Sequence, residues 1–347
     1  MTRRRKFAFA IVAILLSLSL SAAAVLAADL YVHHRAENSA GLNRWGYRGP
    51  VVGRKASGEV RVVMVGGSTV FGYGGPWQES APALLEQELR QARPGAAVSV
   101  VNLGYNNDGA FANLPTLQDY RYLDYDIVVL YNGYNDRGGD GAPNNQVYRR
   151  QSVVFRLTGY SPILPLVLQE KAAMLRNGGS GSSSATSGTP VFRPNIGART
   201  SATALETANA IGQVLGEQLE RFSTVPHGQS DGSADCAWPW SQYCDSVLRA
   251  VTYARAVGAK VAVVTQPIYP DPKHRPREAA QQTALAAAVH QKFEHDPAVV
   301  LLDLSSAIDL SDRNYAFDSM HLGRDGNLKL AQLMAPVVAR LAWPDER

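Results

Sequence analysis

The stretch RVVMVGGSTVFGYG, residues 61–74, is an apolar run that ends in two glycines and is followed at once by Ser68. An apolar run without polar interruption is typical of a strand that is buried on both faces, as in a parallel sheet. The hydroxyl of Ser68 then has two interpretations: it caps a following helix, or it is a nucleophile at the edge of the sheet. The stretch alone favours the cap, so the rest of the chain must decide.

Five apolar runs resemble strands, and stretches with helical spacing lie between them. The runs are residues 60–66, 97–104, 126–133, 259–267 and 298–304, and the helical stretches are residues 83–92, 246–257, 278–293 and 327–343. This alternation predicts a mostly parallel sheet with helices on both faces, which is a doubly wound α/β domain. In such domains, ligands bind beyond the carboxyl ends of the strands.

The composition is that of a globular protein with a sizeable core. The chain has 347 residues, of which 46% are hydrophobic and 18% are charged, and its formal net charge is +4. Apart from the basic residues 3–6, arginine is scattered rather than gathered in a patch. Nucleic-acid binding needs a concentrated basic surface, so we expect no nucleic-acid partner.

The N-terminus predicts export. Basic residues 3–6 precede an uncharged apolar stretch, residues 7–28, which ends at Asp29. The small residues at its end fit a cleaved signal peptide, whereas its length fits a retained membrane anchor. In either case the positive-inside rule leaves the rest of the chain outside the cytoplasm. We expect an inner-membrane protein that faces the periplasm, or a secreted protein if the leader is cleaved.

The predicted organisation has three parts. Residues 1–29 form the anchor or signal peptide, residues 30–57 form a polar linker, and residues 58–345 form the α/β domain. Within that domain, residues 138–244 contain no convincing core strand and include a Gly/Ser-rich segment, so we expect an insertion. Its best predicted helix is residues 203–222.

Only two cysteines occur, Cys236 and Cys244. In an exported protein, a pair this close together is expected to form a disulfide that closes a small loop. Zinc is not expected, because no second pair of cysteines or histidines lies nearby at ligand spacing. Trp238 and Trp240 in the same loop have two interpretations, either a platform that stacks on sugars or an anchor of the loop to the core.

Polar residues follow the predicted strands in an order that suits acyl transfer. Ser68 follows the first strand, Gly104 the second and Asn135 the third, and Asp318 and His321 follow the last. Ser68 is the expected nucleophile, His321 its base and Asp318 the group that orients the imidazole. The backbone N–H groups of Ser68 and Gly104 and the Asn135 amide are the expected oxyanion donors.

The remaining histidines are expected to lack an aspartate in a comparable setting; they are His33, His34, His227, His274, His290 and His295. A nucleophile elbow of the form Gly-x-Ser-x-Gly is not present, because Val70 stands where the second glycine would be. Each catalytic candidate alone has a structural interpretation as a cap or a turn residue, and only their joint order indicates catalysis.

Four blocks of the chain resemble the SGNH (GDSL-type) hydrolase superfamily. They are VVMVGGSTVFGYG with Ser68, VVNLGYNNDG with Gly104, VLYNGYNDR with Asn135, and DSMHLGRDGN with Asp318 and His321. The resemblance covers residues 45–340, and NRWGYRGP and VTQP also look like features of exported or membrane-tethered bacterial members. It departs from the family pattern at Gly67, where the name-giving block has aspartate.

The resemblance implies a flavodoxin-like three-layer α/β/α sandwich and an ester hydrolase that needs no metal or cofactor. We therefore expect a serine esterase that acts outside the cytoplasm through an acyl-enzyme. The expected partners are an ester-bearing small molecule or an O-acylated polysaccharide, and the inner membrane through residues 7–28. An O-acyltransferase acting on glycans and a non-catalytic glycan-binding module are the alternatives.

Overall fold

The structure is a computed structural model, and its chain divides into two units that are described separately. The larger unit comprises Gly46–Gln151 and Ser223–Arg347, and the smaller unit comprises Met1–Trp45 and Ser152–Phe222. The residues that the structure describes are 3–39, 41–136, 150, 152–165, 167–168, 236 and 239–344.

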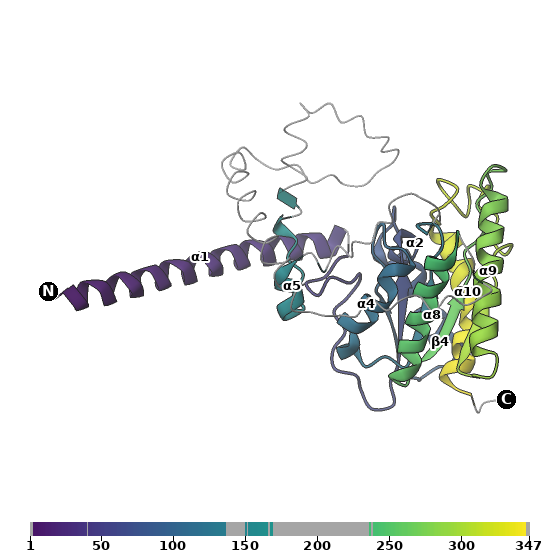
Figure 1. The fold of residues 1–347 in the computed structure, drawn as a ribbon, viewed down its shortest axis with the longest axis horizontal. Helices are drawn as coiled ribbons and strands as arrows, with labels where there is room; N and C mark the ends of the chain where they lie inside the picture. Colours follow the sequence, from purple (N-terminus) through teal and green to yellow (C-terminus); the bar gives the residue numbers. More distant parts are fainter. Residues whose placement is uncertain are drawn as a thin grey trace. The chain divides into compact units, whose positions relative to one another are not determined.

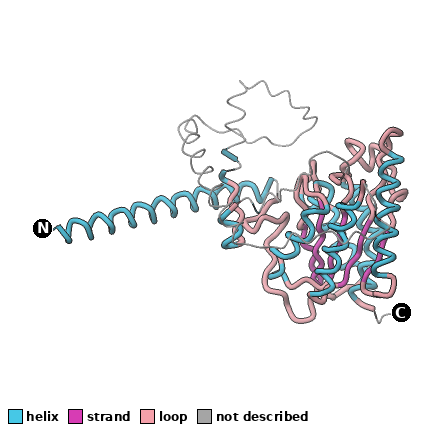
Figure 2. Tube along the Cα trace, in the orientation of Figure 1, coloured by secondary structure: helices cyan, strands magenta, loops and turns pink. Residues whose placement is uncertain are grey.

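The larger unit contains a five-stranded sheet in which all paired strands are parallel. The strand order is β2-β1-β3-β4-β5 (Figure 2, magenta). Each strand lies within one of the five predicted runs: β1 (Val60–Gly66), β2 (Val98–Asn102), β3 (Ile127–Tyr131), β4 (Lys260–Val264) and β5 (Val299–Leu302). The prediction of a parallel sheet is confirmed.

Helices cover both faces of this sheet (Figure 1). One face carries α3 (Ala81–Ala92) and α10 (Arg324–Ala342), which pack against each other, and the other carries α4 (Asn113–Asp119), α8 (Ser241–Ala256) and α9 (Arg275–Phe293). Short helical turns complete the unit: α2 (Ser68–Phe71), η1 (Trp77–Glu79), η2 (Ala110–Ala112) and η3 (Arg121–Leu123). The result is the expected three-layer α/β/α sandwich.

The core explains why the strand sequences are uninterrupted apolar runs. Val62 and Met64 of β1 face the layer of α3 and α10, where they join a cluster that includes Leu85. Because successive strand residues point to opposite faces, Val63 and Val65 face the other helical layer. All five side chains are buried. A strand with helices on both sides leaves no position for a solvated side chain.

The connections place one crevice at the carboxyl edge of the sheet. From β1 the chain passes to β2 on one side, and β3 then pairs with β1 on the other side. The strand order therefore reverses between β1 and β3, and doubly wound sheets bind ligands beyond the carboxyl ends of the strands at such a point. Ser68 follows β1 and Asn135 follows β3, so both residues lie at this point.

The smaller unit contains α1 (Arg3–Ser39) and α5 (Val153–Thr158). Within the described part of the chain, α1 is the one helix long and apolar enough to cross a membrane. Its most apolar 18-residue window has a mean hydropathy of 2.5. A signal sequence near the N-terminus meets the same criterion. The helix does not end with the apolar stretch but continues to residue 39, inside the predicted polar linker.

The end of α1 is tied to the segment that follows α5. The buried carboxylate of Asp29 accepts hydrogen bonds from the backbone N–H groups of Ile163 (3.0 Å) and Leu164 (2.6 Å). One turn further on, His33 Nε2 lies 2.8 Å from the backbone oxygen of Ser161. Asp29 thus does more than end the apolar stretch, because it satisfies two backbone donors that would otherwise be buried without a partner.

The predicted insertion lies largely outside the described residues. This holds for its best predicted helix, residues 203–222, and for most of residues 138–244. At its end, α8 begins at Ser241, before the predicted boundary at 244. The domain limits given above stay predictions.

Candidate active site

The structure brings Ser68, Asp318 and His321 together, although Ser68 and His321 are 253 residues apart in the chain. Ser68 is the first residue of α2, directly after β1. His321 Nε2 lies 2.8 Å from Ser68 Oγ, and His321 Nδ1 lies 2.6 Å from Asp318 Oδ2. A hydroxyl, an imidazole and a carboxylate in this order form the arrangement that activates a serine nucleophile.

A small hairpin presents Asp318 and His321 to the serine. An antiparallel bridge between Ala316 and Leu322 closes it, and Ser319 takes a left-handed conformation (φ 64°) at the turn. The carboxylate of Asp318 also accepts the backbone N–H of His321 at 2.7 Å. The same side chain therefore shapes the turn and aligns the imidazole.

Asp318 is held in its ionised form. Burial alone would raise its pKa, but hydrogen bonds from the His321 backbone and ring and the attraction of the His321 charge outweigh burial and lower the pKa. An ionised Asp318 keeps the proton of His321 on Nδ1 and leaves Nε2 free to accept the proton of Ser68. It also stabilises the imidazolium that this transfer creates.

Two buried side chains hold the short helix that carries Ser68. Asn102, the last residue of β2, donates to the backbone oxygen of Val70 at 2.9 Å. The Arg48 guanidinium donates to the backbone oxygens of Phe71 and Gly72, the latter at 2.6 Å. A cation beside free carbonyls at a helix C-terminus stabilises the helix. Burial lowers the pKa of Arg48 to about 10, so it stays charged at neutral pH.

Arg48 lies in the NRWGYRGP stretch, whose role the sequence did not indicate. The stretch resembles exported or tethered proteins in sequence, but the sequence does not show that Arg48 contacts the turn that carries Ser68. That contact depends on a fold in which residues that precede the sheet return to its carboxyl edge, where the backbone of Arg48 bridges to Asn102.

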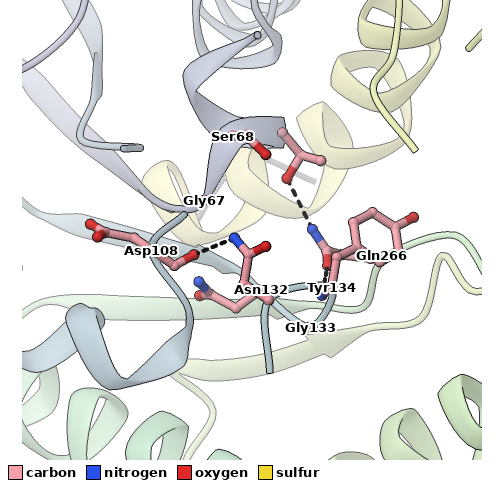
Figure 3. Close-up of a pocket in the computed structure, with 9 residues that line it drawn as sticks. Gly67, Ser68, Asp108, Asn132, Gly133, Tyr134 and Gln266 are labelled. Carbon is pink, nitrogen blue, oxygen red and sulfur yellow. Dashed lines mark hydrogen bonds between the residues drawn. The ribbon is translucent and has the colours of Figure 1, made fainter. Parts of the chain in front are cut away.

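A small pocket lies beside Ser68 and contains the expected amide donor (Figure 3). Asn135 Nδ2 donates to the backbone oxygen of Asp108 at 2.8 Å. An amide nitrogen carries two hydrogens, so the second N–H of Asn135 can serve a ligand. The residues that line the pocket are Gly67, Ser68, Thr69, Asp108, Asn132, Gly133, Tyr134, Asn135 and Gln266.

Gly67 permits this close approach. A Cβ atom at position 67 would lie 2.6 Å from Asn135 Nδ2 and 2.6 Å from the backbone oxygen of Asp108. Real Cβ atoms essentially never come so close to another heavy atom. The departure from the name-giving family block therefore has a physical reason in this chain, since the amide of Asn135 occupies the space that a side chain would need.

Gly104 has a packing role, and its expected role as an oxyanion donor stays a prediction. Its N–H donates to Asn102 Oδ1 at 3.0 Å, and Gly104 is not among the residues that line the pocket. Its missing side chain is required, because a Cβ would lie 2.7 Å from Val70 Cβ. The absence of a side chain therefore permits a close approach to α2.

Gln266 is a pocket residue that the sequence analysis missed. It comes directly after β4, in the VTQP stretch, and is 3% exposed. Its Nε2 donates to Thr69 Oγ1 at 3.0 Å, and its Oε1 accepts the backbone N–H of Tyr134 at 2.8 Å (Figure 3). Thr69 adjoins Ser68 and Tyr134 adjoins Asn135. Gln266 therefore connects the two loops on which Ser68 and Asn135 lie.

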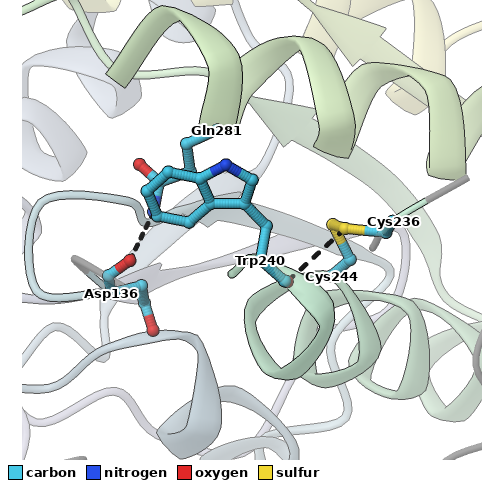
Figure 4. Close-up of a disulfide and its surroundings, with 5 residues drawn as sticks. All are labelled: Asp136, Cys236, Trp240, Cys244 and Gln281. Carbon is cyan, nitrogen blue, oxygen red and sulfur yellow. Dashed lines mark hydrogen bonds between the residues drawn. A yellow bond between two sulfur atoms is a disulfide. The ribbon is translucent and has the colours of Figure 1, made fainter. Parts of the chain in front are cut away.

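Two glutamines of α9 support the same region. Gln282 donates to the backbone oxygen of Gln266 at 2.5 Å, and Gln281 donates to the backbone oxygen of Asp136 at 2.6 Å (Figure 4). Both side chains are buried. The pair of glutamines was the available signal, because two polar residues on the inward face of a helix need partners in the core.

Asp136 is a buried carboxyl group next to Asn135. Burial raises its pKa to about 7, although the hydrogen bond from the Ala110 N–H works in the opposite direction. That bond, 2.9 Å long, joins the loop after β3 to the start of η2. The group thus helps to fix the loop of Asn135, and its charge depends on pH near neutrality.

Cys236 and Cys244 form the predicted disulfide, which ties residue 236 to the first turn of α8 (Figure 4). Trp240 is 6% exposed, and the Arg277 guanidinium lies 5.4 Å from its ring centroid. A buried indole cannot offer a face to a sugar, so the platform interpretation is wrong for Trp240. This residue anchors the loop instead, and Trp238 lies outside the described residues.

The expectation about the other histidines is wrong for His274. Its Nδ1 lies 2.9 Å from Asp271 Oδ2, and the spacing is the same Asp-x-x-His as in residues 318–321. Over the described ranges, no three His, Cys, Asp or Glu side chains are grouped so that they could hold a metal ion.

No protein-family model and no curated protein matches the chain. Among solved structures, a lipolytic protein of the G-D-S-L family from Desulfitobacterium hafniense is 14% identical, with a TM-score of 0.40 over 81% of this chain and 99% of that one. A catalytic mutant of the acetylxylan esterase Axe2 from Geobacillus stearothermophilus is 10% identical, with a TM-score of 0.41 over 82% and 94%. A family 3 carbohydrate esterase from Clostridium thermocellum is 15% identical, with a TM-score of 0.38 over 82% and 99%.

The TM-scores of all three structures are below 0.5, so the reaction and the residue roles proposed for this chain rest on its own geometry.

Proposed function

We propose that the larger unit is a serine ester hydrolase of the SGNH type. The observation that carries this proposal is the continuous chain of contacts from Ser68 Oγ through the His321 ring to Asp318. It lies beside a pocket whose wall includes the amide of Asn135. A structural cap would not require an imidazole at 2.8 Å from the hydroxyl, nor a carboxylate behind the imidazole.

The acylation step uses each of these groups. Ser68 Oγ attacks the ester carbonyl carbon while His321 Nε2 takes the serine proton. Negative charge then develops on the carbonyl oxygen, where the Ser68 N–H and the free N–H of Asn135 are the donors. When the tetrahedral intermediate collapses, the bond to the alcohol oxygen breaks and His321 returns the proton to that oxygen. The acyl group remains on Ser68.

Deacylation repeats the sequence with water. His321 Nε2 takes a proton from a water molecule as its oxygen attacks the acyl carbon, and the same donors stabilise the second intermediate. The bond to Ser68 Oγ then breaks, and His321 gives the proton back to the serine. Asp318 keeps its charge throughout and balances the imidazolium in both steps.

The cellular setting is part of the proposal. The length and apolar composition of α1 support a membrane anchor or a signal peptide, and the disulfide supports an oxidising compartment. We place the enzyme on the outer side of the inner membrane, or outside the cell if the leader is cleaved. O-acylated polysaccharides are accessible there, and two of the similar structures are named as esterases of carbohydrates.

The test combines labelling with turnover. The mature protein is treated with a fluorophosphonate and its intact mass is measured, which reports both the adduct and the N-terminus. We expect one adduct on the wild-type protein, none on Ser68→Ala, and loss of p-nitrophenyl acetate turnover in that variant. Undiminished turnover by Ser68→Ala would contradict the proposal. Addition of glycan acceptors distinguishes a hydrolase from an acyltransferase, because a transferase forms acylated glycan at the expense of free acid.

A further inference from the structure

Two exposed aromatic rings lie close to the ring of His321. The ring centroid of Tyr73 is 5.0 Å from that of His321, and the ring of Phe317 is stacked nearly parallel to His321 at 5.8 Å. Tyr73 is 50% exposed and Phe317 is 39% exposed. Most large hydrophobic side chains in the larger unit are buried, so two exposed rings at the catalytic base require an explanation.

Both rings are held in place by the turn that carries the nucleophile. The backbone N–H of Tyr73 donates to the backbone oxygen of Ser68 at 3.0 Å. Gly74 has a φ of +90°, and a Cβ there would lie 2.5 Å from the ring of Phe317, so only glycine lets this ring pack against the turn. Arg48 then fixes the end of the turn through the backbone oxygen of Gly75 at 2.5 Å.

The reaction decides which half of the ester meets these rings. His321 Nε2 must return its proton to the leaving oxygen, so the alcohol has to lie within hydrogen-bond reach of that nitrogen. The pocket beside Ser68 includes no residue of the hairpin that carries Asp318 and His321. The carbonyl oxygen therefore points to the pocket, where Asn135 lies, and the alcohol lies on the side of His321, against Tyr73 and Phe317.

The surroundings indicate what kind of alcohol fits. The other exposed large hydrophobic side chains that the structure describes in the larger unit are Val51 and Tyr122. Neither belongs to the turn or to the hairpin that carries the two rings, so among the described residues of these two segments the exposed large apolar side chains are these two rings alone. A long alkyl chain needs an exposed apolar surface that extends further. A sugar ring does not, because its faces carry C–H groups that contact an aromatic ring while its hydroxyls stay in water.

We propose that Tyr73 and Phe317 form a subsite for the alcohol half of the ester, and that this subsite takes a pyranose ring. The inference rests on the proposed function, because it needs His321 as the proton donor to the leaving alcohol. It also replaces the loop of Trp240 with the mouth of the active site as the surface that stacks on a sugar.

The experiment compares three acetate esters that differ only in the alcohol. They are methyl acetate, cyclohexyl acetate and a set of mono-O-acetylated methyl pyranosides, with kcat/KM measured by released acetate. We expect the wild-type protein to favour at least one pyranoside ester over both others. In Tyr73→Ala and in Phe317→Ala, the ratio of kcat/KM for that ester to kcat/KM for methyl acetate should fall about 5- to 10-fold, the size of one lost ring contact.

Matched variants separate binding from structure. Tyr73→Phe and Phe317→Tyr keep a ring and should keep the ratio, and Tyr122→Ala removes an exposed ring elsewhere and should leave all three rates unchanged. An equal fall for every ester in Tyr73→Ala and Phe317→Ala would overturn the proposal, because it would mean that the rings only position His321. Wild-type preference for methyl or cyclohexyl acetate would also overturn it. Absence of all turnover and of fluorophosphonate labelling would instead contradict the proposed function.

Discussion

The chain contains two Asp-x-x-His stretches, residues 318–321 and 271–274, whose local geometry is nearly the same. In each, histidine Nδ1 lies within hydrogen-bond distance of the aspartate Oδ2, at 2.6 Å in the first stretch and 2.9 Å in the second. In each, the histidine is one of the partners that lower the pKa of the aspartate. They differ at the other ring nitrogen, where His321 meets Ser68 Oγ and His274 meets no hydroxyl among the described residues.

The comparison shows how little the spacing alone determines. A carboxylate three positions before an imidazole is enough to orient the ring, and such a pair forms within one turn of chain. Catalysis requires a third group from elsewhere in the fold. His321 has a side chain that is 14% exposed and faces the nucleophile turn, whereas that of His274 is 43% exposed at the start of α9.

The largest expected difference between the two stretches comes from removing each imidazole in turn. His321→Ala should lower kcat for p-nitrophenyl acetate by at least about 10⁴-fold, because the serine then has no base. His274→Ala should leave kcat within about twofold of the wild type. Steady-state rates of both purified variants make the comparison. A comparable loss in His274→Ala would show that the two pairs have been assigned wrongly.

The next largest difference in kcat is expected from replacing the two aspartates, Asp318 and Asp271. Asp318→Asn keeps the shape but removes the charge that balances the imidazolium and favours the wrong tautomer, so kcat should fall about 10³-fold. Asp271→Asn should have little effect on kcat. Both rates are measured with p-nitrophenyl acetate, and circular dichroism checks that each variant is folded. Equal rates for Asp318→Asn and the wild type would remove Asp318 from the mechanism.

A smaller effect is expected from the glutamine that joins the two catalytic loops. Gln266→Leu removes its bonds to Thr69 and Tyr134, so the Asn135 donor becomes less well placed and kcat should fall about 10-fold with little change in KM. Gln291→Leu on the exposed side of α9 is the matched control. If KM rises while kcat is retained, Gln266 contacts substrate and does not position the loop.

The smallest expected effect is on stability and concerns Asp136, which lacks the histidine partner of Asp318 and Asp271. Its pKa in the folded protein is about 7, above the usual 3.8. The folded state therefore holds this proton more tightly, and stability falls as pH rises from about 4 to 7. Asp136→Asn removes the titration but keeps an acceptor for the Ala110 N–H.

Thermal unfolding between pH 5 and pH 8 tests this expectation. The decrease in Tm over that range should be smaller in Asp136→Asn than in the wild type by several degrees. An identical pH dependence in the two proteins would show that Asp136 does not titrate in this range. Tyr243 also lies near this carboxyl. Burial, and to a lesser degree the charge of Asp136, raises the pKa of Tyr243 well above the usual value, so Tyr243 does not titrate between pH 5 and pH 8.

The strands were predictable because each is an uninterrupted apolar run, and the parallel sheet followed from their alternation with helices. The contact of Ser68 with His321 and Asp318 was predictable because acyl transfer needs particular residue types in a particular order along the strands. The hydrogen bond from the Gly104 N–H was not predictable, because its direction depends on the side chain of Asn102 two residues before it. Arg48 and Gln266 were missed, because no local pattern indicates a contact across many residues of chain.

The sequence by itself determined the layers of the fold and the chemical types available at one edge of the sheet, since both follow from burial and from strand direction. The sequence assigned Asp318 and His321 to the serine, but only the tertiary structure showed that a second, equal Asp–His pair exists and lies away from Ser68. The same holds for Gly67, which is an ordinary turn glycine in the sequence. In the fold it leaves the space that the Asn135 amide occupies. The loops after β1 and β3 approach so closely there that a Cβ atom at position 67 would clash with this amide.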